Sequence, residues 1–171
     1  MNNNICTEKI NEKISQKINV RIKKLEHFDH ALTLPLYQTE LAAGADIRLI
    51  LQENLRNGPL LIKPWERVAL PTALAFEIPP GFEIQVRPRS GLSLKTGLML
   101  LNSPGTIDAD YRGELKVLMM NNSPEIVQLH HGDRIAQLVL APVWVANFIE
   151  TSTELSWTTR GEQGFGSTGI N

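Results

Sequence analysis

The sequence has little cysteine and almost no net charge. Cys6 is the single cysteine, which excludes an intrachain disulfide and a cysteine-based zinc site and is typical of a reducing cytoplasm. The 17 Lys and Arg residues nearly balance the 18 Asp and Glu residues, giving a formal net charge of −1. Such a chain has no bulk attraction to nucleic acid or to an anionic membrane. Any bound phosphate must therefore be held by locally placed cations and backbone N–H groups.

Long hydrophobic runs are also missing. The longest one, residues 135–149, is interrupted by Gln137, Pro142 and Asn147 and is shorter than the roughly 20 residues that span a bilayer. Residues 1–19 carry Asn, Lys and Glu throughout, so no apolar stretch there could serve as a signal peptide. These two observations predict a soluble, cytoplasmic protein that does not act on membranes.

The length of 171 residues suits a single domain, which would bury roughly 70% of the unfolded chain's surface. Residues 1–17 form an extension of uncertain structure, in which isoleucine recurs at every fourth position from Ile10. This pattern fits either a short amphipathic helix, which would be marginal alone in water, or a frayed or partner-docked tail. We expect a β domain over residues 18–157, followed by a flexible Gly-rich tail over residues 158–171.

From residue 18 onward the apolar pattern has a period of two. Within residues 82–87, Phe, Ile and Val alternate with Glu, Gln and Arg, which predicts a strand with one wet face. Turns rich in Gly, Pro and Asn separate many such short runs, which indicates an all-β sandwich or barrel. The segment Ser90–Thr96 is the best place for one helical turn, with Ser90 as its cap. Further strands are expected at residues 18–22, 68–70, 73–78, 115–119, 126–129, 135–140 and 145–149.

The segment of residues 87–93 could bind phosphate. Arg89 can fork onto two phosphate oxygens, and Ser90 can donate its hydroxyl to a third. Gly91 lets backbone N–H groups come close at the start of a helical turn. However, a surface strand that ends in a capped turn explains the same residues, so both interpretations stand.

The C-terminal residues 160–169 also allow two interpretations. They fit the spacing of a phosphate-binding loop, but the lysine and the strand–helix frame of that loop are missing. A disordered Gly/Ser tail is one interpretation. A lid ordered by a nucleotide is the other, because Arg160 offers a cation and Phe165 an aromatic face for a base.

Asp108 and Asp110 lie two residues apart, with Tyr111 next. They could be solvated turn carboxylates, oxygen ligands of a hard cation, or a base acting on water beside an aromatic wall. Regular strand geometry would put both aspartates on one face and Tyr111 on the other. Asp108 and Tyr111 can face one ligand only if the chain bends between them.

Two other sets of residues carry less information. His130 and His131 point apart on extended backbone and have no further Cys/His cluster nearby, so zinc binding is disfavoured. The three tryptophans are best interpreted as core or interface residues; they are Trp65, Trp144 and Trp157.

Five segments in order resemble the trimeric dUTP pyrophosphatase family, over residues 43 to 169. The segments are residues 43–48 (AGADIR), 88–92 (PRSGL), 105–114 (GTIDADYRGE), 132–137 (GDRIAQ) and 160–169 (RGEQGFGSTG). The resemblance implies a jelly-roll fold and a homotrimer in which three chains build each site. It also implies Mg²⁺-assisted hydrolysis of dUTP to dUMP and pyrophosphate by water attack on the α-phosphorus. That reaction would remove dUTP from the nucleotide pool and supply dUMP for thymidylate synthesis.

The resemblance also implies roles for single residues. Asp108 would be the general base, and Tyr111 would pack against the deoxyribose and exclude a 2′-hydroxyl. Asn102 would hydrogen-bond uracil within a hairpin whose backbone imitates a pairing base. The backbone of that contact would lie around Thr106, Ile107 and Lys116.

A second set of residues would bind the phosphates, and a third would close over the substrate. Asp46 would touch Mg²⁺ through water, with the metal held mainly by the phosphates. The phosphates would be held by Arg89, Ser90, Gly91 and Gln137. In the tail, Arg160 would pair with the terminal phosphate, Phe165 would cover the uracil, and Gly166, Ser167 and Thr168 would close over the phosphates.

The tail departs from the family pattern at Gln163, where the family carries glycine. If this position needs a positive φ, Gln costs roughly 1–2 kcal/mol when the lid closes, which predicts a looser lid and a raised KM. Two rivals are a dCTP deaminase of the same fold, which relies on a glutamate beside the base, and a non-catalytic nucleotide-binding β module. The intact tail and the residue 105–111 hairpin argue against the deaminase. The presence of Asp108 and Arg160 argues against the non-catalytic module.

Overall fold

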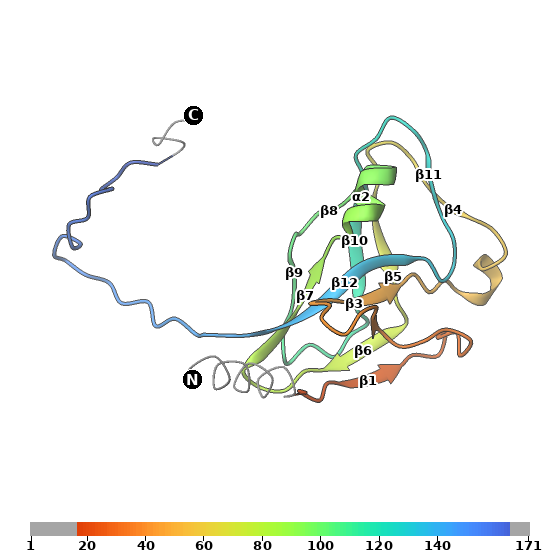
Figure 1. Cartoon of the computed structure of the whole chain (residues 1–171), viewed down its shortest axis with the longest axis horizontal. Helices are drawn as coiled ribbons and strands as arrows, with labels where there is room; N and C mark the ends of the chain where they lie inside the picture. The colour runs from red at the N-terminus through yellow and green to blue at the C-terminus, as the bar shows by residue number, and fades with distance from the viewer. Residues whose placement is uncertain (1–16, 165–171) are drawn as a thin grey trace, which may run out of the picture.

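The computed structural model describes residues 17–164, which form an all-β domain as the sequence predicts (Figure 1). The N-terminal extension up to residue 16 and the predicted lid residues 165–171 lie outside the described part of the chain. One helix, α2 (Ser90–Thr96), and a 3-10 turn at Glu53–Leu55 accompany the strands. The strands are β1 (Arg21–Lys24), β2 (Leu36–Tyr37), β3 (Ala45–Arg48), β4 (Leu60–Ile62), β5 (Arg67–Pro71), β6 (Leu74–Glu77), β7 (Phe82–Arg87), β8 (Leu98–Leu100), β9 (Gly105–Ile107), β10 (Lys116–Asn121), β11 (Val127–Leu129) and β12 (Arg134–Pro142).

The strands pair antiparallel in a jelly-roll-like sandwich. A five-stranded sheet has the order β2-β3-β12-β7-β9, and a three-stranded sheet has the order β5-β10-β8. Two strand pairs, β1-β6 and β11-β4, complete the body. Within residues 17–164, no helix has the length and apolar character that crossing a membrane requires.

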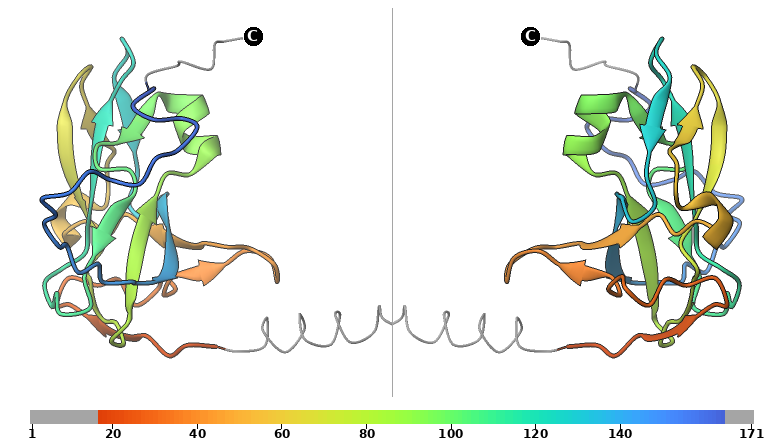
Figure 2. Two further views of the ribbon diagram at one scale, coloured as in Figure 1. Left: turned by 90° about the vertical axis from the view of Figure 1, so that its left-hand side faces the viewer. Right: turned by 90° about the vertical axis from the view of Figure 1, so that its right-hand side faces the viewer.

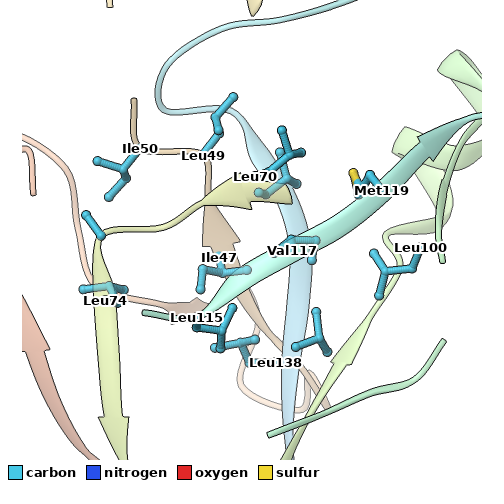
Figure 3. Close-up of a cluster of buried hydrophobic side chains, with 14 of the residues drawn as sticks. Ile47, Leu49, Ile50, Leu70, Leu74, Leu100, Leu115, Val117, Met119 and Leu138 are labelled. Carbon is cyan, nitrogen blue, oxygen red and sulfur yellow. The ribbon is translucent and has the colours of Figure 1, made fainter. Parts of the chain in front are cut away.

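The core lies between these sheets and is built by the inward side of the period-two pattern. Ile47 of β3 and Leu138 of β12 meet Val117 of β10 there (Figure 3). Their exposed fractions are 1%, 5% and 0%, and burying each such side chain stabilises the fold by about 1.5–3 kcal/mol. The outward side of the same strands is left for polar residues, which include Asp46 and Gln137.

The expectation that Ser90 caps the helix is wrong. The capping position is Arg89, whose backbone is extended at φ −95 and ψ 119, and Ser90 is the first helical residue. The extended backbone of β7 thus continues for two residues before the helix starts. The side chain of Arg89 holds it there, since its Nε donates to Asp46 Oδ1 at 2.9 Å and its Nη1 donates to the Arg134 carbonyl at 3.0 Å.

The strand expected at residues 145–149 is also absent from the described structure. After β12, residues 143–164 run away from the body as an extended arm without strand pairing (Figure 1). The views of Figure 2 look along this arm, so it overlaps the body there. Trp144 is 92% exposed and Phe148 is 94% exposed, so neither belongs to the core. Trp65 and Trp157 are also exposed, which makes the core interpretation wrong for all three tryptophans and leaves the interface interpretation as a prediction.

Candidate active site

A cavity of about 430 Å³ lies beside the loop that joins β9 to β10. Six residues expected at the uracil, sugar and water positions line it together: Asn102, Thr106, Ile107, Asp108, Tyr111 and Lys116. Three residues without an expected role complete the lining: Glu114, Leu115 and Leu118. The cavity therefore gathers one coherent part of the predicted site.

The predicted bend between Asp108 and Tyr111 is present. Strand β9 ends at Ile107, and the Tyr111 N–H donates to the Asp108 carbonyl at 3.2 Å. This turn breaks the alternation of a regular strand, so Asp108 and Tyr111 both face the cavity. Asp110 is exposed and does not line it.

Strand β9 also exposes backbone to the site. It stands at the edge of the five-stranded sheet and pairs only with β7 there, with Thr106 opposite Gln85. An edge strand leaves one row of its N–H and C=O groups unpaired. Asn102 packs against this strand closely, because a Cβ on Gly105 would lie 3.2 Å from Asn102 Nδ2. The hairpin thus presents an amide side chain and edge backbone side by side.

A second group of predicted residues lies on the outer face of the five-stranded sheet. The two oxygens of Asp46 each face an arginine, Arg89 at 2.9 Å and Arg134 at 3.0 Å. A register shift between Arg134 and Ala136 interrupts the pairing of β12 with β3. Such a bulge re-aims side chains, and here Arg134 and Gln137 both stand opposite outward residues of β3. Asp46 is thereby held in a nearly buried, doubly charge-assisted pair.

Gln137 is fixed beside this group. Its Nε2 donates to the Pro88 carbonyl at 2.9 Å, and it pairs with Asp46 across the sheet. A Cβ on Gly44 would lie 2.6 Å from Gln137 Oε1, so this close approach requires glycine at position 44. Ser90 and Gly91 follow Arg89 on the exposed start of α2, and a Cβ on Gly91 would meet nothing within 4 Å.

The described residues contain no metal cage. Within residues 17–164, no group of three or more His, Cys, Asp or Glu side chains could hold an ion. Both Asp46 oxygens have arginine partners, so Asp46 can offer at most an outer contact to a cation. This donor set fits Mg²⁺, which keeps several waters and is commonly carried by substrate phosphates.

His130 and His131, the two histidines considered for zinc, lie beside aspartates of the body. His131 Nδ1 accepts a hydrogen bond from the Leu51 N–H at 3.0 Å, and its Nε2 lies 2.9 Å from Asp29 Oδ2. Both ring nitrogens are therefore occupied. His130 is exposed and lies 4.0 Å from Asp133.

Arg160 is not brought to either group. Its Nε donates to the Gln163 carbonyl at 2.9 Å within the exposed arm. Its expected partners in the lid lie outside the described residues; they are Phe165, Gly166, Ser167 and Thr168. The described chain thus contains a cavity and a cationic group, and Arg160 contacts neither of them.

Sequence reasoning missed four residues of these two groups, and three of them carried a signal. Leu118 is an apolar residue on the wet side of β10, where Lys116 also points, and such a residue suggests contact with a ligand or a partner. Arg134 belongs to the fourth family-like segment, but its spacing from Asp46 cannot reveal the ion pair. Glu114 ends the third family-like segment, but its contact with Ala73, some 40 residues upstream, does not show in the sequence, and Leu115 gave no signal.

Comparison with known proteins identifies the family of the chain. The sequence model of the family described as dUTPase matches residues 30–169. Deoxyuridine 5'-triphosphate nucleotidohydrolase of Bdellovibrio bacteriovorus is 54% identical over 154 residues, 90% of this chain and 98% of that protein. The enzyme of the same name from Dinoroseobacter shibae is 55% identical over 141 residues, 82% of this chain and 90% of that protein.

Solved structures give the same result. Staphylococcus bacteriophage 80alpha dUTPase with dUpNHpp has a TM-score of 0.74 at 26% identity, covering 90% of this chain and 100% of that chain. A mutant dUTPase from phage phi11 of S. aureus, described for its coordination of a structural Mg(II) ion, has a TM-score of 0.64 at 25% identity and covers 80% of this chain and 98% of that chain. The match of the family model, the two relatives and the shared fold establish that the chain belongs to the dUTPase family.

Proposed function

We propose that the chain hydrolyses dUTP to dUMP and pyrophosphate, with Asp108 as the base that orients and deprotonates the attacking water. The observation that carries the proposal is the turn that brings Asp108 and Tyr111 into one cavity with Asn102. A positioned carboxylate contributes typically 10²–10⁴-fold to such a reaction. The reaction would lower dUTP in the nucleotide pool and supply dUMP for thymidylate synthesis. We place it in the cytoplasm, because a chain with a single cysteine has no intrachain disulfide and fits a reducing compartment.

Recognition of uracil is assigned to Asn102 and to the unpaired backbone edge of β9 around Thr106 and Ile107, with backbone near Lys116 completing the contact. Uracil offers N3–H and O4 where cytosine offers N3 and an amino group, so donor and acceptor are reversed at two positions. Binding cytosine would leave two groups unpaired, at about 1–3 kcal/mol each. This difference is enough for strong discrimination without an editing step.

Recognition of the sugar is assigned to Tyr111. Tyr111 follows Asp108 by three residues and lines the same cavity. There its ring can pack against deoxyribose and leave no room for a 2′-hydroxyl. A wall of this kind selects by exclusion, so it acts only if the ring is held in place.

The phosphates are assigned to the group on the outer sheet face. Arg89 and Gln137 lie together there, and the open start of α2 at Ser90 and Gly91 lets phosphate oxygens approach backbone N–H groups. Mg²⁺, when bound with the substrate, neutralises the triphosphate and fixes its geometry. Asp46 would contact it through water while keeping Arg89 in position. In-line attack then needs one base and a fixed phosphorus.

We further propose a homotrimer whose sites are completed by neighbouring chains. The arm that follows β12 supports this proposal, because it carries Trp144 and Phe148 at more than 90% exposure. Large exposed apolar segments of this kind mark interaction sites. From such an arm, Arg160, Phe165, Gly166, Ser167 and Thr168 would close over the site of another copy.

A deaminase reaction on dCTP is not favoured. It would need a free glutamate beside the base, and Glu114 is the one glutamate among the described residues that line the cavity. Its Oε1 accepts from the Ala73 N–H at 2.8 Å and lies 3.2 Å from His27 Nε2, and its Oε2 lies 3.7 Å from Lys116 Nζ. Leu118 occupies another wall of the same cavity.

The test is pyrophosphate release from dUTP, UTP, dCTP and dTTP, with wild type and Asp108→Asn compared. We expect dUTP to be hydrolysed preferentially and the substitution to lower kcat by about 10²–10⁴-fold, because the amide cannot accept the proton of water. Equal rates in the two proteins would remove Asp108 from the base position. Ammonia from dCTP would support the deaminase, and hydrolysis of all four nucleotides alike would contradict the uracil pocket.

A further inference from the structure

The Tyr111 ring is tethered to its own loop through the phenol oxygen. Tyr111 Oη donates to the Glu114 carbonyl at 3.0 Å, three residues further along the chain. The Tyr111 N–H also donates a hydrogen bond to the Asp108 carbonyl. Both ends of the tyrosine, its backbone and its hydroxyl, are thus bonded to residues of the same loop. The position of the ring therefore depends on where the backbone of residues 113 and 114 lies.

Gly113 lies directly against the ring. A Cβ at this position would stand 2.6 Å from Tyr111 Cζ and 3.0 Å from Cε2, closer than real Cβ contacts come. Gly113 has no left-handed backbone conformation that would itself demand glycine. Space for the ring is therefore the reason for glycine here. Gly113 does not line the cavity, whereas Tyr111 does.

Glu114 anchors this loop to the body of the protein. Its carboxylate accepts from the N–H of Ala73 at 2.8 Å, a residue held at φ +53 in the corner between β5 and β6. The same oxygen lies 3.2 Å from His27 Nε2, and the side chain is only 15% exposed.

The residue that follows Glu114 adds two further bonds to the same corner. The Leu115 N–H donates to the Leu74 carbonyl at 2.8 Å, and the Thr72 hydroxyl donates to the Leu115 carbonyl at 2.6 Å. The Leu115 side chain is part of the core (Figure 3). The Glu114 carbonyl, which accepts the hydrogen bond of the phenol, is therefore rigidly placed.

We propose that Gly113 and Glu114 form a seat that sets the position of the Tyr111 ring and so determines the selection of deoxyribose over ribose. The inference rests on the proposed hydrolysis of dUTP, and Gly113 and Glu114 act in it as positioning residues. Gly113 leaves the space that the Tyr111 ring occupies, and the Glu114 carbonyl accepts a hydrogen bond from the Tyr111 hydroxyl. The Glu114 carboxylate fixes both to the Ala73 corner. A ring that moves away from the sugar position leaves room for a 2′-hydroxyl, so UTP is admitted and the dUTP-to-UTP ratio falls.

The experiment measures kcat and KM for dUTP and UTP in wild type, Gly113→Ala and Gly58→Ala. Gly58 is the matched control, since a Cβ there meets nothing within 4 Å. We expect Gly113→Ala to lower the ratio of kcat/KM for dUTP to that for UTP by about 10- to 100-fold, as ångström-scale misplacement of a wall does. Gly58→Ala should keep the wild-type ratio.

A double-mutant cycle separates a seat from a general loss of structure. In a Tyr111→Ala background there is no ring to displace, so adding Gly113→Ala should leave the dUTP-to-UTP ratio as Tyr111→Ala alone has it. A further loss of the ratio in the double variant would overturn the seat, as would a wild-type ratio in Gly113→Ala.

If Gly113→Ala does not fold, Tyr111→Phe tests the tether alone. It should lower the ratio about threefold, the worth of one ordinary hydrogen bond, and an unchanged ratio would overturn the seat. Wild type reports on the proposed function in the same assay. A wild type that releases no pyrophosphate from dUTP contradicts the function, whereas an active, selective wild type with unaffected variants contradicts the seat alone.

Discussion

Gln163 is the residue at which the tail departs from the family pattern, and the backbone angle φ that it adopts should affect KM for dUTP. In the described arm its φ is not positive, and its carbonyl accepts from Arg160 Nε at 2.9 Å. If lid closure turns this position to a positive φ, Gln163→Gly removes about 1–2 kcal/mol of strain and lowers KM for dUTP about 5- to 30-fold. Steady-state kinetics should show this change with kcat unaltered. Gln163→Ala, which keeps a Cβ, is the control and should keep the wild-type KM; an unaltered KM in Gln163→Gly would count against the strain.

At the same scale, the sequence identifies which residues form the cavity but not how they meet. Asn102, Asp108 and Tyr111 are found through the family resemblance, and all three line the cavity. Alternation alone would have separated Asp108 from Tyr111, because a strand turns successive side chains to opposite faces. The hydrogen bond from the Tyr111 N–H to the Asp108 carbonyl makes a turn there, and the turn brings both side chains to the cavity. The contacts of Glu114 could not be found, since its partners Ala73 and His27 are remote in sequence.

Among the secondary-structure elements, the period-two pattern predicts long strands well and short ones poorly. Strand β7 has the expected bounds, and β12 extends the expected range by one or two residues at each end. Strands β2, β3 and β9 have only two to four residues, too few for alternation to show. They are strands because a neighbouring strand offers them hydrogen bonds. Residues 145–149 show the converse, since alternation gives a segment two faces but no partner.

The segment between β1 and β2 is held to the body by Asp29, and this attachment should depend on pH. The Ala31 N–H, then His131, hold the pKa of Asp29 below the ordinary 3.8 of an aspartate, and Arg56 adds to the effect. A lowered pKa in the folded state means that this stabilisation is fully present above pH 3.8 and is lost as the pH falls through the folded-state pKa.

Asp29→Asn should therefore lower the free energy of unfolding at neutral pH, and its gap to wild type should narrow in acid. Urea unfolding of both proteins between neutral pH and about pH 3 measures this gap. Glu150→Gln, in the exposed arm, is the control and should stay level with wild type. A gap that keeps its size in acid would show that the Asp29 charge is not what holds the segment.

At the scale of the whole molecule, one chain holds the parts of a site without closing it. The cavity lies by the β9–β10 loop, and the cationic group lies on the outer face of β3 and β12. The two share none of the residues that line or form them. The arm that would bring Arg160 to a substrate leaves the body at Val143, whose N–H donates to the Gly81 carbonyl at 2.9 Å, and residues 144–163 beyond it are exposed. Under the proposed homotrimer, neighbouring copies would supply what a single copy lacks.

Two truncations test whether the arm builds this assembly or only closes it. Wild type should have a native mass three times the 19.1 kDa of one chain. A chain ending at Trp157 keeps the apolar arm, so it should remain a trimer while losing at least about a hundredfold in kcat/KM, because the lid no longer orders the substrate. A chain ending at Pro142 also loses Trp144 and Phe148, whose burial on neighbours would contribute about 1.5–3 kcal/mol each, and it should dissociate. Light scattering that finds this shorter chain still trimeric would remove the arm from the interface.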